Sequence, residues 1–136
     1  MATRVDTLPA ITIRPADFTR LDQLTVAAEH ALPEVAEFLG RELDRAKVAP
    51  SIASDVVTMG SRVLFRDDAG QDHDVTLVYP EEANMEKGRL SVLTPVGAAM
   101  IGLSVGQSIR WRTRNGDERT LTVLGVSQAP ADGEDA

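Results

Sequence analysis

The hydrophobic pattern of this chain changes its period once, near residue 50, and this change constrains the fold more than any other feature. Between residues 15 and 46 apolar side chains recur every three or four positions, the spacing of an amphipathic helix. After the linking segment Lys47–Asp55, which is rich in small and turn-forming residues, they alternate in short runs, the spacing of half-buried strands. The pattern therefore predicts an α+β protein, with a helical part at residues 1–50 and a sheet part at residues 51–136.

The helical part is predicted to be a short antiparallel hairpin. Pro15 and Pro33 each suit the first turn of a helix, where a backbone N–H has no partner within the helix, and acidic residues follow both. We expect one helix from about Pro15 to Glu29 and a second from Pro33 to Ala46, joined by a few residues. Each helix would be only ~20–25 Å long.

The sheet part is predicted to be an antiparallel sheet with one short helix. Thr94 is a hydroxyl cap with Pro95 just inside, which predicts a helix that begins there and ends at Gly102. Asn115-Gly116 between two alternating runs predicts a tight hairpin turn. The acidic tail 129–136 is expected to be frayed. We expect strands at residues 63–65, 75–79, 90–93, 108–114 and 118–126.

Composition argues against several classes of function. The net charge is −7, made up of −2 in residues 1–50 and −5 in residues 51–136, which disfavours electrostatic binding to nucleic acid or to an anionic membrane. The chain has no cysteine, and therefore no disulfide, thiolate metal site or cysteine nucleophile. No signal peptide or membrane span is visible, so we expect a cytoplasmic protein. We also expect that the protein needs no cofactor.

The candidate chemical groups do not converge on a catalytic or metal site. His30 lies near the predicted hairpin turn, and His73 stands between Asp72 and Asp74, which an extended strand directs to the face opposite its own. No nucleophile elbow of the form G-x-S-x-G is present. Alternating arginines form a possible basic stripe on one strand, but a solvated sheet face is the favoured interpretation; they are Arg110, Arg112 and Arg114. We predict no catalytic residue and no metal ligand.

Three acidic residues lie at the predicted hairpin tip, namely Glu29, Glu34 and Glu37. They could present carboxylates to a divalent cation that is bound elsewhere. The favoured interpretation is that they stabilise helix ends, since Glu34 and Glu37 fall in the opening turns of the second helix.

Four ordered segments carry a family resemblance; they are Val57–Val63 (VTMGSRV), Leu77–Ala83 (LVYPEEA), Leu90–Ala99 (LSVLTPVGAA) and Gly102–Ile109 (GLSVGQSI). This series resembles the C-terminal domain of the Gre transcript-cleavage factors, which has an FKBP-like α+β fold. The residues of these segments are most similar to those of the Rnk family of regulators of nucleoside diphosphate kinase. The segment Glu42–Ala46 in the helical part also resembles that family. The resemblance covers about residues 10–126.

The resemblance implies a monomer that binds RNA polymerase at the rim of its secondary channel, without sequence-specific contact to nucleic acid. Gre factors dock through the strand end and turn before the short helix. Ser91, Thr94 and Pro95 match that segment. Leu93 departs from it, because Gre-type sequences can carry an acidic or amide residue there; an apolar contact is expected in its place.

Compared with the Gre factors, the predicted hairpin lacks both the length and the acidic tip of their coiled coil. Gre factors use a long coiled coil to bring acidic residues to the polymerase active centre, where these help to hold a catalytic magnesium. The hairpin here is shorter, and the Asp-x-x-Glu pattern of the Gre tip is absent from His30 to Glu34. We therefore expect a protein that occupies the Gre site without stimulating cleavage, competes with Gre factors, and affects nucleoside diphosphate kinase levels indirectly.

Two alternatives stay open. One is a Gre-like cleavage factor in which Glu34 or Glu37 acts on magnesium. The other is a peptidyl-prolyl isomerase, suggested by the FKBP-like fold alone. The aromatic content counts against an isomerase pocket, because the chain has one Trp, one Tyr and three Phe. Trp111 and Phe65 are expected to be ordinary core or sheet-face residues.

Overall fold

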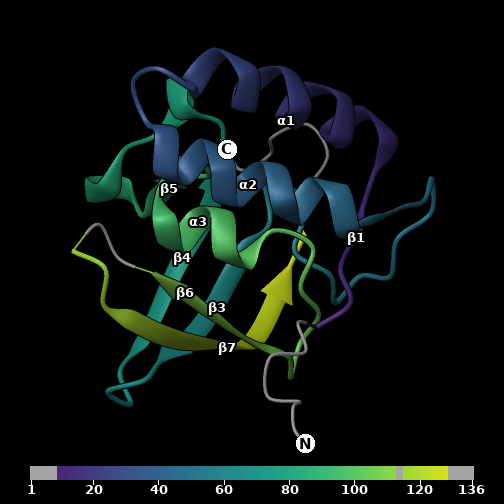
Figure 1. Cartoon of the computed structure of the whole chain (residues 1–136). Coiled ribbons are helices and arrows are strands. Elements are labelled where there is room, and N and C mark those ends of the chain that lie inside the picture. The colour runs from purple at the N-terminus through teal and green to yellow at the C-terminus, as the bar shows by residue number, and fades with distance from the viewer. Residues whose placement is uncertain (1–8, 113–114, 129–136) are drawn as a thin grey trace, which may run out of the picture.

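The helices of this protein lie in layers on one face of a five-stranded sheet. The computed structural model describes residues 9–112 and 115–128. Helix α3 (Pro95–Met100) lies nearest the sheet, and the hairpin of α1 (Pro15–Ala28) and α2 (Pro33–Arg45) lies over it, with α2 between α1 and α3 (Figure 1). No helix in the described part of the chain is long and apolar enough to cross a membrane.

The predicted hairpin is confirmed, with both helices beginning at their prolines. At 14 and 13 residues, each helix is about 20 Å long. A feature that the sequence pattern did not predict closes the base of the hairpin. There β1 (Thr12–Ile13) pairs in parallel with β2 (Lys47–Val48).

The α+β class is confirmed, but the prediction of an antiparallel sheet is wrong for one strand pair. The order is β5-β4-β3-β7-β6, and β4 with β5 is parallel while the other pairs are antiparallel. Parallel neighbours need a crossover rather than a tight turn. Two single-turn 3-10 helices, η2 and η3, provide it by carrying the chain back so that β5 begins with Arg89 opposite Thr76 of β4. The bounds are β3 Arg62–Asp67, β4 Asp72–Val78, η2 Pro80–Glu82, η3 Met85–Lys87, β5 Arg89–Ser91, β6 Ser108–Arg112 and β7 Glu118–Ser127.

The hairpin β6–β7 is confirmed, with Gly116 at φ 88° in its turn. Of the predicted basic stripe, Arg110 is exposed and lies 3.9 Å from Glu118. Arg114 and the acidic tail fall outside the described residues.

Helical hairpin and sheet share one hydrophobic core. Apolar side chains along the whole length of the hairpin are buried in the same cluster as those of α3 and the inner sheet face. The proposed division at residue 50 stays a prediction, and buried side chains pack continuously across it. Representative members are Ile13, Leu21, Val35, Leu39, Leu43, Val63, Leu77, Ile101 and Leu121.

A polar clamp fixes α1 to the segment that follows β4. The Tyr79 hydroxyl donates to Asp17 Oδ1 at 3.3 Å, and the Arg20 guanidinium lies 3.7 Å from the centre of the Tyr79 ring. Arg20 also pairs with Glu81, and Arg14 donates to the Asp17 carboxylate. Burial raises the pKa of Tyr79, and the Asp17 carboxylate adds to that rise. The clamp and the shared core hold the hairpin against the body of the protein.

Candidate functional site

The predicted docking residues form one tightly bonded turn between β5 and α3, which we call the docking turn (residues 91–95). The Thr94 hydroxyl donates to the Ser91 carbonyl at 2.8 Å and accepts the Gly97 backbone N–H at 3.0 Å. Ser91 Oγ accepts the Leu93 backbone N–H at 3.0 Å. The predicted helix cap at Thr94 is therefore confirmed. These bonds leave Leu93 and Pro95 half-exposed on the surface.

Gly97 allows the docking turn to close. A Cβ at this position would lie 2.3 Å from the Ser91 carbonyl oxygen and 2.9 Å from Thr94 Oγ1. No side chain fits in that space, so glycine is required for the first turn of α3 to approach the end of β5 so closely.

The tip acids are all exposed. Glu34 lies in the first turn of α2, where a carboxylate favours the positive end of the helix dipole, whereas Glu29 is the C-terminal cap of α1, where it does not. Glu37 is 4.0 Å from Arg41, one helical turn along. Among the residues that the structure describes, no group of three or more potential ligands could hold a metal ion.

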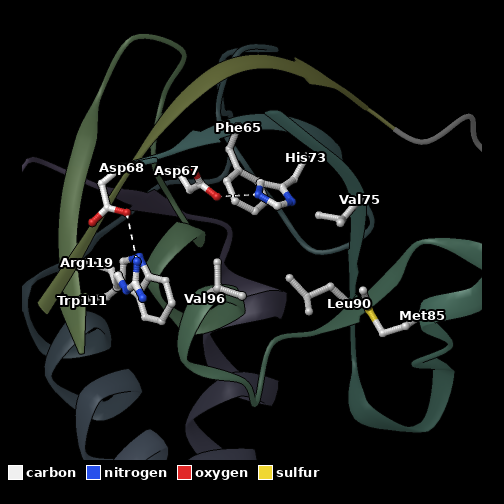
Figure 2. A pocket seen from close by; sticks show the side chains of 10 residues that line it. All are labelled: Phe65, Asp67, Asp68, His73, Val75, Met85, Leu90, Val96, Trp111 and Arg119. Atoms are coloured by element: carbon white, nitrogen blue, oxygen red, sulfur yellow. Dashed lines mark hydrogen bonds and ion pairs between the residues drawn. The ribbon is translucent and has the colours of Figure 1, made fainter. Parts of the chain in front are cut away.

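Next to the docking turn, the inner sheet face is hollowed into a cavity of about 430 Å³, which we call the sheet pocket. Figure 2 shows its apolar walls, with side chains from the strands, from η3 and from the start of α3 around one space. Phe65 is buried, as expected of a core residue, and Trp111 is half-buried. Both line the pocket, and Met85 lies at its rim. The sequence pattern did not predict this pocket.

His73 and Asp67 form one edge of the sheet pocket. His73 Nε2 lies 2.8 Å from Asp67 Oδ2, and the imidazole stacks on Phe65 with ring centres 4.9 Å apart. The neighbours of His73 point the other way, as predicted: Asp72 and Asp74 bind Arg66 and Arg62 on the outer face.

The pKa of Asp67 is held below its ordinary value, chiefly by the hydrogen bond with His73 and then by the Gln71 backbone N–H. A depressed carboxyl pKa adds stability above the unfolded-chain pKa of about 3.9, and this stability is lost as pH falls through the folded-state pKa. We expect a carbon-13 NMR titration of Asp67 to show a midpoint below that value. His73→Ala should move the midpoint upward, and an unmoved midpoint in that variant would contradict the assignment.

Trp111 leaves one polar atom without a partner. Its Nε1 atom is buried and makes no hydrogen bond in the structure. A buried indole N–H usually finds an acceptor. Arg119, directly opposite Trp111 on β7, lies beside the indole and reaches Asp68 at 3.4 Å.

Two family models cover most of the chain. Residues 9–48 match the model described as "Rnk N-terminus". Residues 52–128 match the model described as "Transcription elongation factor, GreA/GreB, C-term", and they include the docking turn and the sheet pocket.

Individual relatives agree with these matches. The chain is 41% identical to the regulator of nucleoside diphosphate kinase of Escherichia coli K12 over 125 residues, which is 90% of this chain and 92% of that protein. It is 33% identical to transcription elongation factor GreA of Desulfovibrio desulfuricans over 57% of this chain and 48% of that protein. A solved structure of the GreA/GreB elongation factor from Nitrosomonas europaea superposes with a TM-score of 0.68 at 34% identity, covering 88% of this chain and 98% of that one.

Proposed function

Because this chain belongs to the Rnk family and carries the C-terminal domain of the GreA/GreB transcription elongation factors, we propose that it is a transcription regulator that binds RNA polymerase. It binds as a monomer at the rim of the secondary channel, through the docking turn. There it excludes Gre factors and does not stimulate transcript cleavage. Its effect on nucleoside diphosphate kinase levels then passes through transcription.

The docking turn is the observation that carries this proposal. Three side-chain hydrogen bonds within residues 91–97 fix its shape before any partner arrives. A preorganised turn loses little conformational freedom on binding. Leu93 and Pro95 offer the partner a small apolar surface, which suits an apolar contact in place of the polar one in Gre-type sequences.

The packing of the hairpin supports the absence of cleavage stimulation. Each helix is about 20 Å long, and buried residues such as Ala28 and Val35 continue almost to the tip. Most of that length therefore lies against the body of the protein instead of extending away from it. The exposed tip acids Glu29, Glu34 and Glu37 cannot be carried far beyond the docking surface.

Competition with a Gre factor for core RNA polymerase tests the proposal. We expect the wild-type protein to displace a labelled Gre factor and to suppress Gre-stimulated cleavage in stalled complexes. Leu93→Ala and Pro95→Ala should each weaken displacement about tenfold, as loss of a central interface contact does. Pro15→Ala is the matched control, because Pro15 is likewise the first-turn proline of a helix and is exposed at the base of the hairpin.

Two outcomes would contradict the proposal. Unchanged Gre-stimulated cleavage at saturating protein would remove the competitor role. Cleavage of stalled complexes by the protein alone, abolished by Glu34→Gln or Glu37→Gln, would instead assign the chain to the cleavage factors.

A further inference from the structure

We propose that Asp17, Arg20 and Tyr79 of the polar clamp are positioning residues, which fix the direction of the helical hairpin relative to the docking turn. Once the docking turn is bound to RNA polymerase, that direction determines where the tip of the hairpin lies. This inference rests on the proposed function and deepens it, because it gives a role in binding to residues that lie outside the docking turn.

Helix α1 is the outermost of the helical layers. It packs against α2, which lies between α1 and α3 (Figure 1). Apolar packing alone is not directional, so it would leave α1 some freedom to tilt on α2. The clamp adds directional contacts, because Asp17 and Arg20 lie in the first two turns of α1 and reach Tyr79, directly after β4. It therefore joins the outermost layer to the sheet.

The clamp and the docking turn are linked through one strand pair. Tyr79 directly follows Val78, and Val78 is the register partner of Ser91, the first residue of the docking turn. The Val92 backbone N–H also donates to the Val78 carbonyl at 2.9 Å. The contact with α1 is thus made by the residue next to the one that holds the docking turn, so a shift at the clamp changes the angle between hairpin and docking turn.

The base of the hairpin supplies a second fixed point. Beside the pairing of β1 with β2, the Lys47 backbone N–H donates to the Ile11 carbonyl at 2.9 Å. The Thr12 N–H donates to the Gly102 carbonyl, just after α3, at 3.2 Å. A rigid rod that is held at one point can pivot, whereas one that is held at two points cannot. With its base fixed, the hairpin takes its direction from the clamp.

The clamp resists displacement because its polar groups are buried together. Asp17 and Tyr79 are each 8% exposed. The Tyr79 hydroxyl lies 3.3 Å from Asp17 Oδ1, and Arg14 donates to Asp17 Oδ2 at 2.8 Å. The Arg20 guanidinium lies over the Tyr79 ring, 3.7 Å from its centre, and pairs with Glu81. Moving α1 away would leave the buried hydroxyl and the buried carboxylate each without a partner, and that loss opposes any tilt of the helix.

The distance between two spin labels reports the direction of the hairpin in the free protein. The sequence contains no cysteine, so two introduced cysteines are the only attachment sites. Ala31→Cys places one label at the hairpin tip, and Ala69→Cys places the other in the turn between β3 and β4; both alanines are exposed. With the clamp intact, we expect pulsed electron paramagnetic resonance to give one narrow distribution of label-to-label distances.

Clamp variants should broaden or shift that distribution. Tyr79→Phe removes the hydroxyl that binds Asp17, and Arg20→Gln removes both the charge over the aromatic ring and an ion pair. Arg20→Lys keeps a cation and should restore part of the narrow distribution. Arg62→Gln is the matched control, because Arg62 is also an exposed arginine paired with a carboxylate, that of Asp74, but lies on the outer sheet face. It should leave the distribution unchanged.

The position of the tip on polymerase is the second readout. A benzophenone crosslinker attached at Ala31→Cys alone should react with one site on core RNA polymerase when the clamp is intact, and with several sites in Tyr79→Phe and Arg20→Gln. These two variants should also bind about threefold more weakly, because a hairpin that is no longer preorganised loses more conformational freedom on binding. In Arg62→Gln, both the crosslinked site and the affinity should match those of the wild type.

The outcomes separate this inference from the proposed function. Narrow, unshifted distances in both Tyr79→Phe and Arg20→Gln would overturn the positioning role, even with a lowered unfolding temperature, because the clamp would then only stabilise the fold. Altered distances with wild-type crosslinking and affinity would overturn the link between hairpin direction and binding. If the wild-type protein did not bind polymerase, the proposed function and the crosslinking prediction would fail together, while the distances in the free protein would still confirm or contradict that the clamp directs the hairpin.

Discussion

Leu39→Ala should lower the free energy of unfolding of the whole chain by about 2–5 kcal/mol, in one cooperative transition. Leu39 lies on α2, is 0% exposed, and belongs to the cluster that also holds the inner face of the sheet. Its loss leaves a cavity between hairpin and sheet, so both should unfold together. Denaturant unfolding followed by far-UV circular dichroism reports mainly the helices, and Trp111 fluorescence reports the sheet.

Val26→Ala is the control for this measurement. Val26 is 62% exposed on α1, and its truncation should change the free energy of unfolding by less than about 0.5 kcal/mol. If Leu39→Ala shifted the helical signal but left the Trp111 transition in place, residues 1–50 and 51–136 would unfold independently, and a shared core would be the wrong description.

Gly97→Ala should both destabilise the protein and weaken its displacement of a Gre factor. The new methyl group would lie 2.3 Å from the Ser91 carbonyl oxygen, which the Thr94 hydroxyl holds at 2.8 Å. Since backbone atoms form one side of this contact, the docking turn itself must move. We expect a loss of about 1–3 kcal/mol in stability, the usual cost of overpacking, and about a tenfold loss in polymerase binding.

Gly40→Ala is the matched substitution, and it is expected to raise the free energy of unfolding where Gly97→Ala lowers it. A Cβ at Gly40 would meet nothing within 4 Å, and the residue lies inside α2. Alanine there should therefore stabilise the protein by about 0.5–1 kcal/mol.

The Gly97→Ala prediction also has a contradicting outcome. If the folded Gly97→Ala variant bound polymerase as strongly as the wild type, the docking turn would not be the contact.

Features encoded by neighbouring residues were predictable from the sequence. Pro15 and Pro33 mark the starts of their helices because proline fixes its own φ and lacks an N–H. Thr94 caps α3 through a hydrogen bond that spans only three residues. The docking turn is a local structure of the same kind, so its residues could be placed in advance, whereas their contact with polymerase stays a prediction.

Features that depend on the register of distant segments were not predictable. The hydrogen bond between Asp17 and Tyr79 joins residues 62 positions apart. The parallel pairing of β4 with β5 depends on how residues 79–88 fold back. The alternation of apolar and polar residues within a strand does not indicate whether the strand runs parallel or antiparallel to its neighbour. The pocket needs Phe65, Val96 and Trp111 from three separate elements, and no single-strand pattern reports that they meet.

The packing of the hairpin also suggests how such a chain can change its reach over evolution. The buried face of α1 and α2 ends at Ala28 and Val35, and the turn between them is exposed apart from the half-buried Leu32, which packs against the core. An insertion of about seven residues on each side of that turn would add two turns, about 10 Å, to both helices. The buried faces of both helices would keep their contacts, and the docking turn would be unchanged. A family built on this body could therefore diversify by lengthening at one exposed turn, while its anchoring surface stayed the same.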